Sequence, residues 1–156
     1  MELVNESEAG GDLLTLREII VWHADDDRGI RQAMGQLLNQ TPRLKLSRDF
    51  GSAEELLEAL QLGPAPHVIL LDLKMTGMSG LDAIGPIKQR APQTHVILFT
   101  SFFDSAAQKK ALAAGASDFV LKRLSANELV RLIKRFFRIA APPEKGVISA
   151  LRITNA

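Results

Sequence analysis

The chain contains 156 residues, of which 46% are hydrophobic and 24% are charged, a composition typical of one globular domain. Lysine and arginine number 19 against 18 aspartates and glutamates, and the resulting net charge of +1 lacks the basic excess of most nucleic-acid-binding domains. The absence of cysteine excludes disulfides, thiolate zinc sites and a cysteine nucleophile.

From the N-terminus, the chain begins with a polar extension over residues 1–17, followed by a folded unit that we expect at 18–139. In this unit, short apolar runs alternate with amphipathic segments, which predicts an α/β fold with a doubly wound, five-stranded parallel sheet and helices on both faces. In chain order, the predicted strands are 18–24, 44–49, 67–72, 95–100 and 117–121. A proline-containing tail follows over residues 140–156.

The segments between the strands carry helical signals of different strength. Three of them have candidate N-cap serines that stand three residues before an acidic residue: Ser52, Ser79 and Ser125. Pro86 lies inside the third predicted helix, and we expect it to kink or shorten that helix because proline lacks a backbone donor. The fourth helix, about 104–114, offers mainly alanines to the core: Ala107, Ala111 and Ala114. Because alanine buries little area, we expect this helix to be the mobile one.

Neither end of the chain predicts membrane association or export. No apolar run approaches the ~20 residues that a membrane-spanning helix needs. The first residues are acidic and polar, whereas a signal peptide is basic and then apolar. We therefore expect a cytoplasmic protein.

Oxygen-bearing and cationic side chains follow the predicted strands, where ligands bind in a sheet of this class. They are Asp25, Asp26 and Asp27 after the first strand, Asp72 after the third, Thr100 at the end of the fourth and Lys122 after the fifth. His67 and His95 lie at the opposite strand ends, which argues against a histidine-based hydrolase or a histidine metal site. Converging carboxylates repel one another, and all-oxygen ligation favours Mg²⁺ or Mn²⁺. A lysine and a hydroxyl beside them indicate phosphoryl chemistry, in which Asp72 can be the nucleophile.

These residues resemble the bacterial response regulator receiver domain over about residues 18–139. The matching segments are Asp25-Asp26-Asp27-x-x-Ile30-Arg31, 68–82, 96–100 and 115–122. The resemblance implies that Asp72 accepts a phosphoryl group, and that Mg²⁺ is bound by Asp25, Asp26, Asp72 and the backbone carbonyl of Lys74. It also implies that Thr100 and Lys122 contact the phosphoryl group and that Thr100 and Phe119 form the switch. The strand order is expected to be the flavodoxin-like 2-1-3-4-5.

The same resemblance implies a function in two-component phosphorelay signalling, as a stand-alone signalling protein and not an enzyme. The phosphodonor would be a histidine kinase or a histidine phosphotransfer protein. Output would pass to a protein partner or a homodimer through helix 4, strand 5 and helix 5, without direct nucleic-acid or membrane contact. Two positions depart from the family pattern, because Arg123 and Thr76 stand where proline is usual. A cis peptide bond before Arg123 would cost ~2.5–4 kcal/mol, so we expect a trans bond there.

Two other functions fit parts of the pattern. A haloacid-dehalogenase-like phosphohydrolase would use Asp25 as its nucleophile and Asp27 as acid and base, although Gly29 stands where that family has threonine or valine. A pseudo-receiver would bind partners without ever being phosphorylated.

Several residues also have purely structural interpretations. Asp27 is expected to cap the following helix, and Phe119 has a competing interpretation as an ordinary core residue. We expect His23 to be a buried, hydrogen-bonded histidine, and Phe102 and Phe103 to form partial core beneath a loop. The last helix is predicted to have a solvated basic face, formed by Lys134, Arg135 and Arg138.

Overall fold

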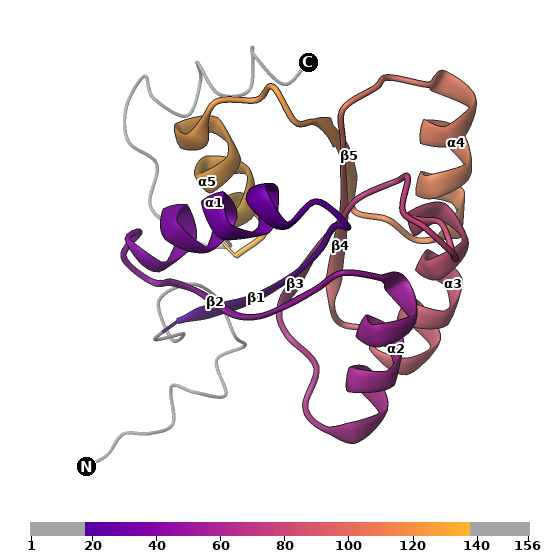
Figure 1. The fold of residues 1–156 in the computed structure, drawn as a ribbon, viewed down its shortest axis with the longest axis horizontal. Helices are drawn as coiled ribbons and strands as arrows, with labels where there is room; N and C mark the ends of the chain where they lie inside the picture. The colour runs from indigo at the N-terminus through magenta and orange to yellow at the C-terminus, as the bar shows by residue number, and fades with distance from the viewer. Residues whose placement is uncertain (1–17, 138–156) are drawn as a thin grey trace.

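The computed structural model describes residues 18–137, which form five strands and five helices (Figure 1). The strands are β1 (Ile19–Ala24), β2 (Leu44–Phe50), β3 (Val68–Leu71), β4 (His95–Thr100) and β5 (Asp118–Leu121). The helices are α1 (Arg28–Asn39), α2 (Ala53–Leu62), α3 (Gly80–Arg90), α4 (Ser105–Ala114) and α5 (Ala126–Arg135). The predicted extension 1–17 and tail 140–156 lie outside the described residues, as do residues 138 and 139 of the predicted folded unit.

All five strands are parallel, in the order β2-β1-β3-β4-β5, which confirms the predicted fold class and strand order. The order reverses between β1 and β3, so the carboxyl ends of these two central strands lie side by side. Strand β3 is two residues shorter than predicted. Its flanking residues nevertheless continue the pairing with β1, since His67 N donates to Ile20 O at 2.9 Å and Asp72 N donates to Ala24 O at 3.0 Å.

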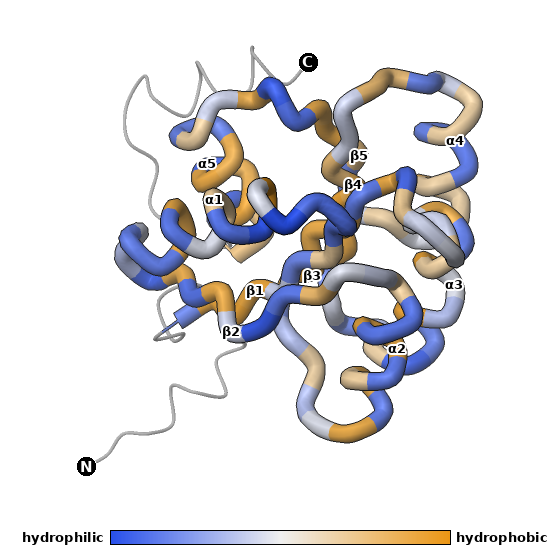
Figure 2. The backbone as a smooth tube through the Cα atoms, in the orientation of Figure 1, coloured by the Kyte–Doolittle hydropathy of each residue, from blue (hydrophilic) through white to orange (hydrophobic). Residues whose placement is uncertain are grey.

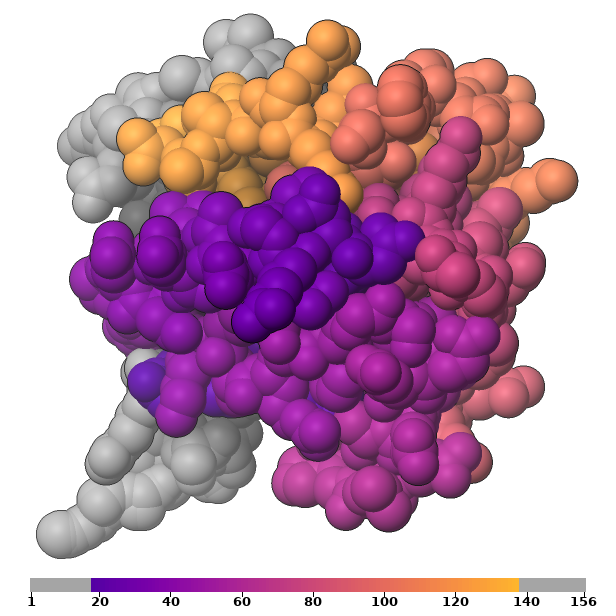
Figure 3. All heavy atoms as spheres, viewed as in Figure 1, coloured from indigo at the N-terminus to yellow at the C-terminus, as the bar shows by residue number. Residues whose placement is uncertain are grey.

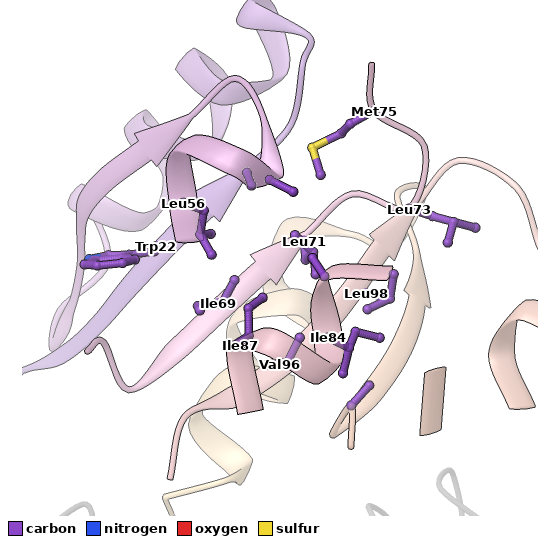
Figure 4. Close-up of a cluster of buried hydrophobic side chains, with 14 of the residues drawn as sticks. Trp22, Leu56, Ile69, Leu71, Leu73, Met75, Ile84, Ile87, Val96 and Leu98 are labelled. Carbon is purple, nitrogen blue, oxygen red and sulfur yellow. The ribbon is translucent and has the colours of Figure 1, made fainter. Parts of the chain in front are cut away.

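Helices cover both faces of the sheet. Helices α2, α3 and α4 pack on one face over a cluster that includes Ile69, Leu71 and Leu98, whereas α1 and α5 pack on the other face over Val21 and Leu70. Figure 4 shows the first cluster, with Ile84 and Ile87 of α3 directed at the strands. In Figure 2, hydrophobic stretches follow the central strands and hydrophilic stretches lie toward the outside of the helices. Burial on both faces explains why these strands are apolar along their whole length.

The capping predictions are confirmed at Ser52, Ser79 and Ser125, each of which accepts a bond from the backbone N–H three residues later. Of the two effects expected of Pro86, a kink or a shortened helix, the shortening is wrong, because α3 continues through Pro86 to Arg90. Burial of residues on both sides of the proline, including Ile84 and Ile87, stabilises the helix and offsets the one lost backbone donor.

Helix α4 is the helix that the sequence predicts to bury little apolar area. It buries Ala107 and Ala111, but the prediction for Ala114 is wrong, because that residue is exposed. Phe102 and Phe103, on the loop before α4, are 65% and 60% exposed, so the prediction that they form partial core is also wrong. This loop therefore presents aromatic side chains to solvent beside a lightly anchored helix.

None of the five helices in residues 18–137 has the length and apolar character that crossing a bilayer requires.

Candidate functional site

Three carboxylates converge where β1 and β3 end. Asp25, Asp26 and Asp72 each offer an oxygen atom within 4.8 Å of the others. The local backbone brings them together because β1 and β3 are neighbours and α3 begins directly over the end of β3. A side chain at Gly80 would place its Cβ atom 2.1 Å from the carbonyl oxygen of Asp72, so only glycine permits this approach.

Lys122 reaches the cluster from the end of β5. Its Nζ donates to Asp25 Oδ2 at 2.6 Å and lies 3.4 Å from Asp72 Oδ1. Its backbone N–H donates to the carbonyl of Thr100 at 2.7 Å, which ties the end of β5 to the end of β4. The sequence predicted this residue at the site, and the structure confirms that it faces the acidic cluster.

Asp25 is buried and both of its carboxylate oxygens already have partners. Oδ1 accepts from the backbone N–H of Asp27 at 2.8 Å, while Oδ2 accepts from Lys122. Its backbone carbonyl accepts from Arg31 Nη1 at 2.6 Å. No role was predicted for Arg31, although its place in the first motif, one helical turn into α1, was a usable signal.

Asp26 is exposed and is held from the opposite side, by the β3–α3 loop (residues 72–79). Its Oδ2 accepts from the backbone N–H of Thr76 at 3.1 Å and lies 3.4 Å from the Thr76 hydroxyl. Figure 3 shows the corresponding contact, with the indigo start of α1 lying against the rose-coloured segment that follows β3. No described residue donates a hydrogen bond to Oδ1 of Asp26.

The site carries more negative than positive charge. Burial, together with the neighbouring carboxylate of Asp25, raises the pKa of Asp72 from 3.8 to about 6, and the Lys122 ammonium only partly opposes this. In total, one lysine, Lys122, faces three carboxylates. An all-oxygen donor set with this imbalance fits a divalent cation such as Mg²⁺, which uses one or two carboxylates, waters and phosphate oxygens.

Thr100 ends β4 next to Lys122, and Phe119 lies within β5; the switch role expected of both stays a prediction. Thr100 is buried, and its Oγ1 accepts from Phe102 N at the long distance of 3.5 Å. Phe119 is buried in the core, with its ring edge-on to Phe103 at a centroid distance of 6.4 Å. The interpretation of Phe119 as a core residue is confirmed, and its role in the switch stays a prediction.

Lys74 and Phe102 form a contact across the mouth of the site. The Lys74 ammonium lies 5.4 Å from the centre of the Phe102 ring, within the range of a cation–π interaction. Each residue stands two positions after a site residue, Asp72 or Thr100, at the ends of adjacent strands. The contact between the two side chains could not be predicted from the sequence pattern.

His23 corrects one prediction. It is buried, yet neither ring nitrogen has a hydrogen-bond partner among residues 18–137. The nearest carboxylate atom, Asp25 Oδ2, is 3.9 Å from Nε2, because that oxygen instead bonds Lys122. Burial lowers the pKa of His23 to about 4, so the ring is neutral at physiological pH.

The remaining predicted residues take structural positions. Asp27 caps α1 by accepting from Ile30 N at 3.1 Å, as expected. His67 and His95 lie at the amino ends of their strands, away from the acidic cluster. The peptide bond before Arg123 is trans, also as expected. Lys134 and Arg135 lie on α5, and Arg138 lies outside the described residues.

Residues 21–134 match the response regulator receiver domain family. The chain belongs to this family. Among its relatives, the DNA-binding transcriptional regulator NtrC of Escherichia coli (strain K12) is 37% identical over 116 residues, which are 74% of this chain and 24% of that protein. Response regulator protein VraR of Staphylococcus aureus (strain Mu3 / ATCC 700698) is 29% identical over 135 residues, 86% of this chain and 64% of that protein.

Solved structures give the same result. The response regulator domain of Thermotoga maritima CheB superposes with a TM-score of 0.70 at 28% identity, covering 80% of this chain and all of that one. The BeF3-activated receiver domain of DrrB, also from Thermotoga maritima, gives 0.68 at 31% identity, covering 78% and 99%. The chain is thus a receiver domain of two-component signalling, with an acidic pocket consistent with a phosphoacceptor. It spans about a quarter of the length of NtrC, so the DNA binding in that name describes the longer protein.

Proposed function

We propose that Asp72 accepts a phosphoryl group in a Mg²⁺-dependent reaction and that the resulting acyl phosphate changes a protein-interaction surface. The observation that supports this most directly is the position of Asp72 at the centre of the strand ends. Lys122 Nζ lies 3.4 Å from Asp72 Oδ1, and Asp25 and Asp26 each offer an oxygen within 4.8 Å of an Asp72 oxygen.

In the proposed reaction, a carboxylate oxygen of Asp72 forms a bond to phosphorus while the bond to the donor breaks. The donor is a phosphohistidine on a histidine kinase or phosphotransfer protein, or a small acyl phosphate. With an acyl phosphate, the P–O bond to the leaving carboxylate breaks and that carboxylate departs with the electron pair. The Lys122 ammonium and the Thr100 hydroxyl would bind the phosphoryl oxygens, since phosphoryl transfer depends mainly on positioning and charge neutralisation.

Asp26, Asp72 and the backbone carbonyl of Lys74 would hold Mg²⁺ together with Asp25. When bound, the ion supplies positive charge that offsets the carboxylates and the phosphoryl oxygens. The two oxygens of Asp25 are already bonded to Lys122 and the Asp27 amide, so Asp26 is the exposed carboxylate with an oxygen still available. We infer that Asp26 contributes most to cation affinity.

The output proposal rests on the surface formed by α4, β5 and α5, through which a protein partner or a second copy of the chain would bind. Helix α4 is anchored by the small side chains of Ala107 and Ala111, so a few kcal/mol of contacts to the phosphoryl group suffice to shift its population. Phe119 and the exposed Phe103 connect the site to this surface. We place the protein in the cytoplasm and propose no direct DNA contact by this chain.

The haloacid-dehalogenase-like alternative gains no support from the site. Its nucleophile would be Asp25, whose two oxygens are bonded to Lys122 and the Asp27 amide, and its acid and base would be Asp27, which caps α1. A pseudo-receiver interpretation was raised by Arg123. With a trans bond before Arg123, Lys122 Nζ still lies 2.6 Å from Asp25 Oδ2 and 3.4 Å from Asp72 Oδ1, which supports a phosphorylated receiver over a pseudo-receiver.

Beryllofluoride, a mimic of a phosphoryl group on aspartate, tests the proposal without a kinase. Titration in the presence of Mg²⁺, followed by ¹⁹F NMR, should show one bound species in the native chain and none in Asp72→Asn. Asp82→Asn removes a similar charge from the exposed first turn of α3 and serves as the matched control. Equal binding by native protein and Asp72→Asn would contradict the assignment of Asp72.

A further inference from the structure

The β3–α3 loop is fixed at several points that do not depend on a cation. Gly80 N donates to Leu73 O at 2.8 Å and closes the loop, and Met75 buries its side chain in the core (Figure 4). On the far side, Glu54 of α2 accepts from Met78 N through Oε2 at 2.9 Å. Thr76 therefore stands on a loop whose path is set by its neighbours.

Gly77 explains how the loop turns between these anchors. Its φ of +85° lies in the left-handed region, and a Cβ atom there would come within 2.8 Å of Glu54 Oε2. The turn directs the peptide N–H of Thr76 toward Asp26 and that of Met78 toward Glu54. Two carboxylates, one from each side, thus clamp a three-residue stretch of the loop.

Thr76 leaves Asp26 with two unequal oxygens. Oδ2 accepts from the Thr76 N–H at 3.1 Å and has the Thr76 hydroxyl at 3.4 Å, whereas no described residue donates to Oδ1. A proline at this position, which the family pattern usually has, would offer neither donor. The arrangement is therefore a consequence of the residue that this particular chain carries.

The geometry points to Thr76 as a positioning and specificity-determining residue, which makes Asp26 a one-oxygen ligand and so favours Mg²⁺ over Ca²⁺. Mg²⁺ requires a small octahedral shell, with one oxygen from each of one or two carboxylates. Ca²⁺ takes six to eight oxygens and commonly uses both oxygens of a carboxylate. A carboxylate with one oxygen bonded to the loop therefore suits Mg²⁺ and weakens the binding of Ca²⁺. This inference rests on the proposed cation site at Asp26.

The test measures Mg²⁺ and Ca²⁺ affinities separately by isothermal titration calorimetry on the full chain, with each metal chloride alone. Thr76→Ser keeps both donors, Thr76→Val removes the hydroxyl, and Thr76→Pro removes both. Loss of hydrogen bonds to metal-ligating groups typically lowers metal affinity ~10-fold or more. We expect the ratio of Mg²⁺ to Ca²⁺ affinity to fall about 10-fold in Thr76→Pro, less in Thr76→Val, and to stay unchanged in Thr76→Ser.

Glu54→Gln is the matched control, because it weakens the other clamp of the same loop without touching Asp26. It should leave the Mg²⁺ to Ca²⁺ ratio unchanged, even if both affinities fall. If the Mg²⁺ to Ca²⁺ affinity ratio falls in Thr76→Pro but not in Thr76→Val, the proposal is supported and the peptide N–H is the donor that matters. An unchanged ratio in Thr76→Pro, or an equal fall of the ratio in Glu54→Gln, overturns it.

The failure of this inference is distinguishable from failure of the proposed function. If the native chain binds Mg²⁺ and Asp26→Ala does not, but the Thr76 variants retain the native ratio, only the role of Thr76 is refuted. If the native chain binds neither cation, the cation site itself is refuted and the role of Thr76 with it.

Discussion

Replacing Asp72 by asparagine should stabilise the metal-free protein. Burial and the Asp25 carboxylate raise the pKa of Asp72 from 3.8 to about 6, so its ionised form is disfavoured in the folded state. Each unit of pKa difference between folded and unfolded chains corresponds to about 1.4 kcal/mol, and the ionised carboxylate therefore costs about 2–3 kcal/mol of folding free energy. Asparagine has nearly the same shape without the charge. For a chain of this size, each kcal/mol gained in unfolding free energy raises Tm by about 2–4 °C.

The pH dependence follows from the direction of this shift. Because the pKa is raised on folding, the cost is complete above pH 6, shrinks as the pH falls toward 3.8, and disappears when Asp72 is protonated in both states. Urea unfolding at pH 7.5 and pH 4 in the presence of a chelator measures this free-energy cost of the ionised carboxylate. The stability difference between Asp72→Asn and the native chain should be large at pH 7.5 and small at pH 4.

Asp82→Asn provides the control for this experiment, because it removes an exposed carboxylate from the start of α3. It should change stability by less than ~0.5 kcal/mol. Mg²⁺ should stabilise the native chain more than Asp72→Asn, which reduces the difference in unfolding free energy between the two proteins. An Asp72→Asn variant no more stable than the native chain at pH 7.5 would refute the reasoning, as would a gap of equal size at pH 4.

Three further outcomes follow from the site. Asp26→Ala should lower Mg²⁺ affinity at least ~10-fold in calorimetric titration, and native affinity in this variant would place the metal elsewhere. The acyl phosphate should last for minutes or longer, because the Phe102 ring would shield it and the Lys74 ammonium cannot accept a proton from an attacking water. Phe102→Ala should shorten the lifetime of the acyl phosphate. Loss of the native label within seconds would contradict this prediction. Substitutions in α4 such as Ala111→Gly should leave phosphorylation intact but abolish the accompanying change in self-association or partner binding, measured by analytical ultracentrifugation. Sequence-specific DNA binding by this chain would contradict the proposed output.

The convergence of Asp25, Asp26, Asp72 and Lys122 could be predicted because it depends on topology alone. Apolar runs that alternate with amphipathic segments define a parallel sheet, and all carboxyl ends of such a sheet lie at one edge. The residue that follows each strand is then a site residue by position. The structure brings oxygens of the three carboxylates within 4.8 Å of one another and Lys122 within 3.4 Å of Asp72, in the predicted strand order.

Features that depend on the path of a loop or the direction of one side chain could not be predicted. Within the described part of the chain His23 has no hydrogen-bond partner, and the nearby Asp25 Oδ2 bonds Lys122 instead, a competition that no local pattern encodes. Phe102 and Phe103 are exposed because the loop before α4 lies at the rim of the sheet, although their hydrophobicity favoured burial. The Thr76 bond to Asp26 joins residues 50 positions apart through a turn at Gly77.

Intact-mass measurement after incubation with Mg²⁺ and a small acyl phosphate tests the central claim most directly. The native chain should gain one phosphoryl group, the gain should disappear with a chelator, and Asp72→Asn should gain none. Modification of Asp72→Asn at the native rate would contradict the account, and label on Asp25 would favour the phosphohydrolase chemistry instead.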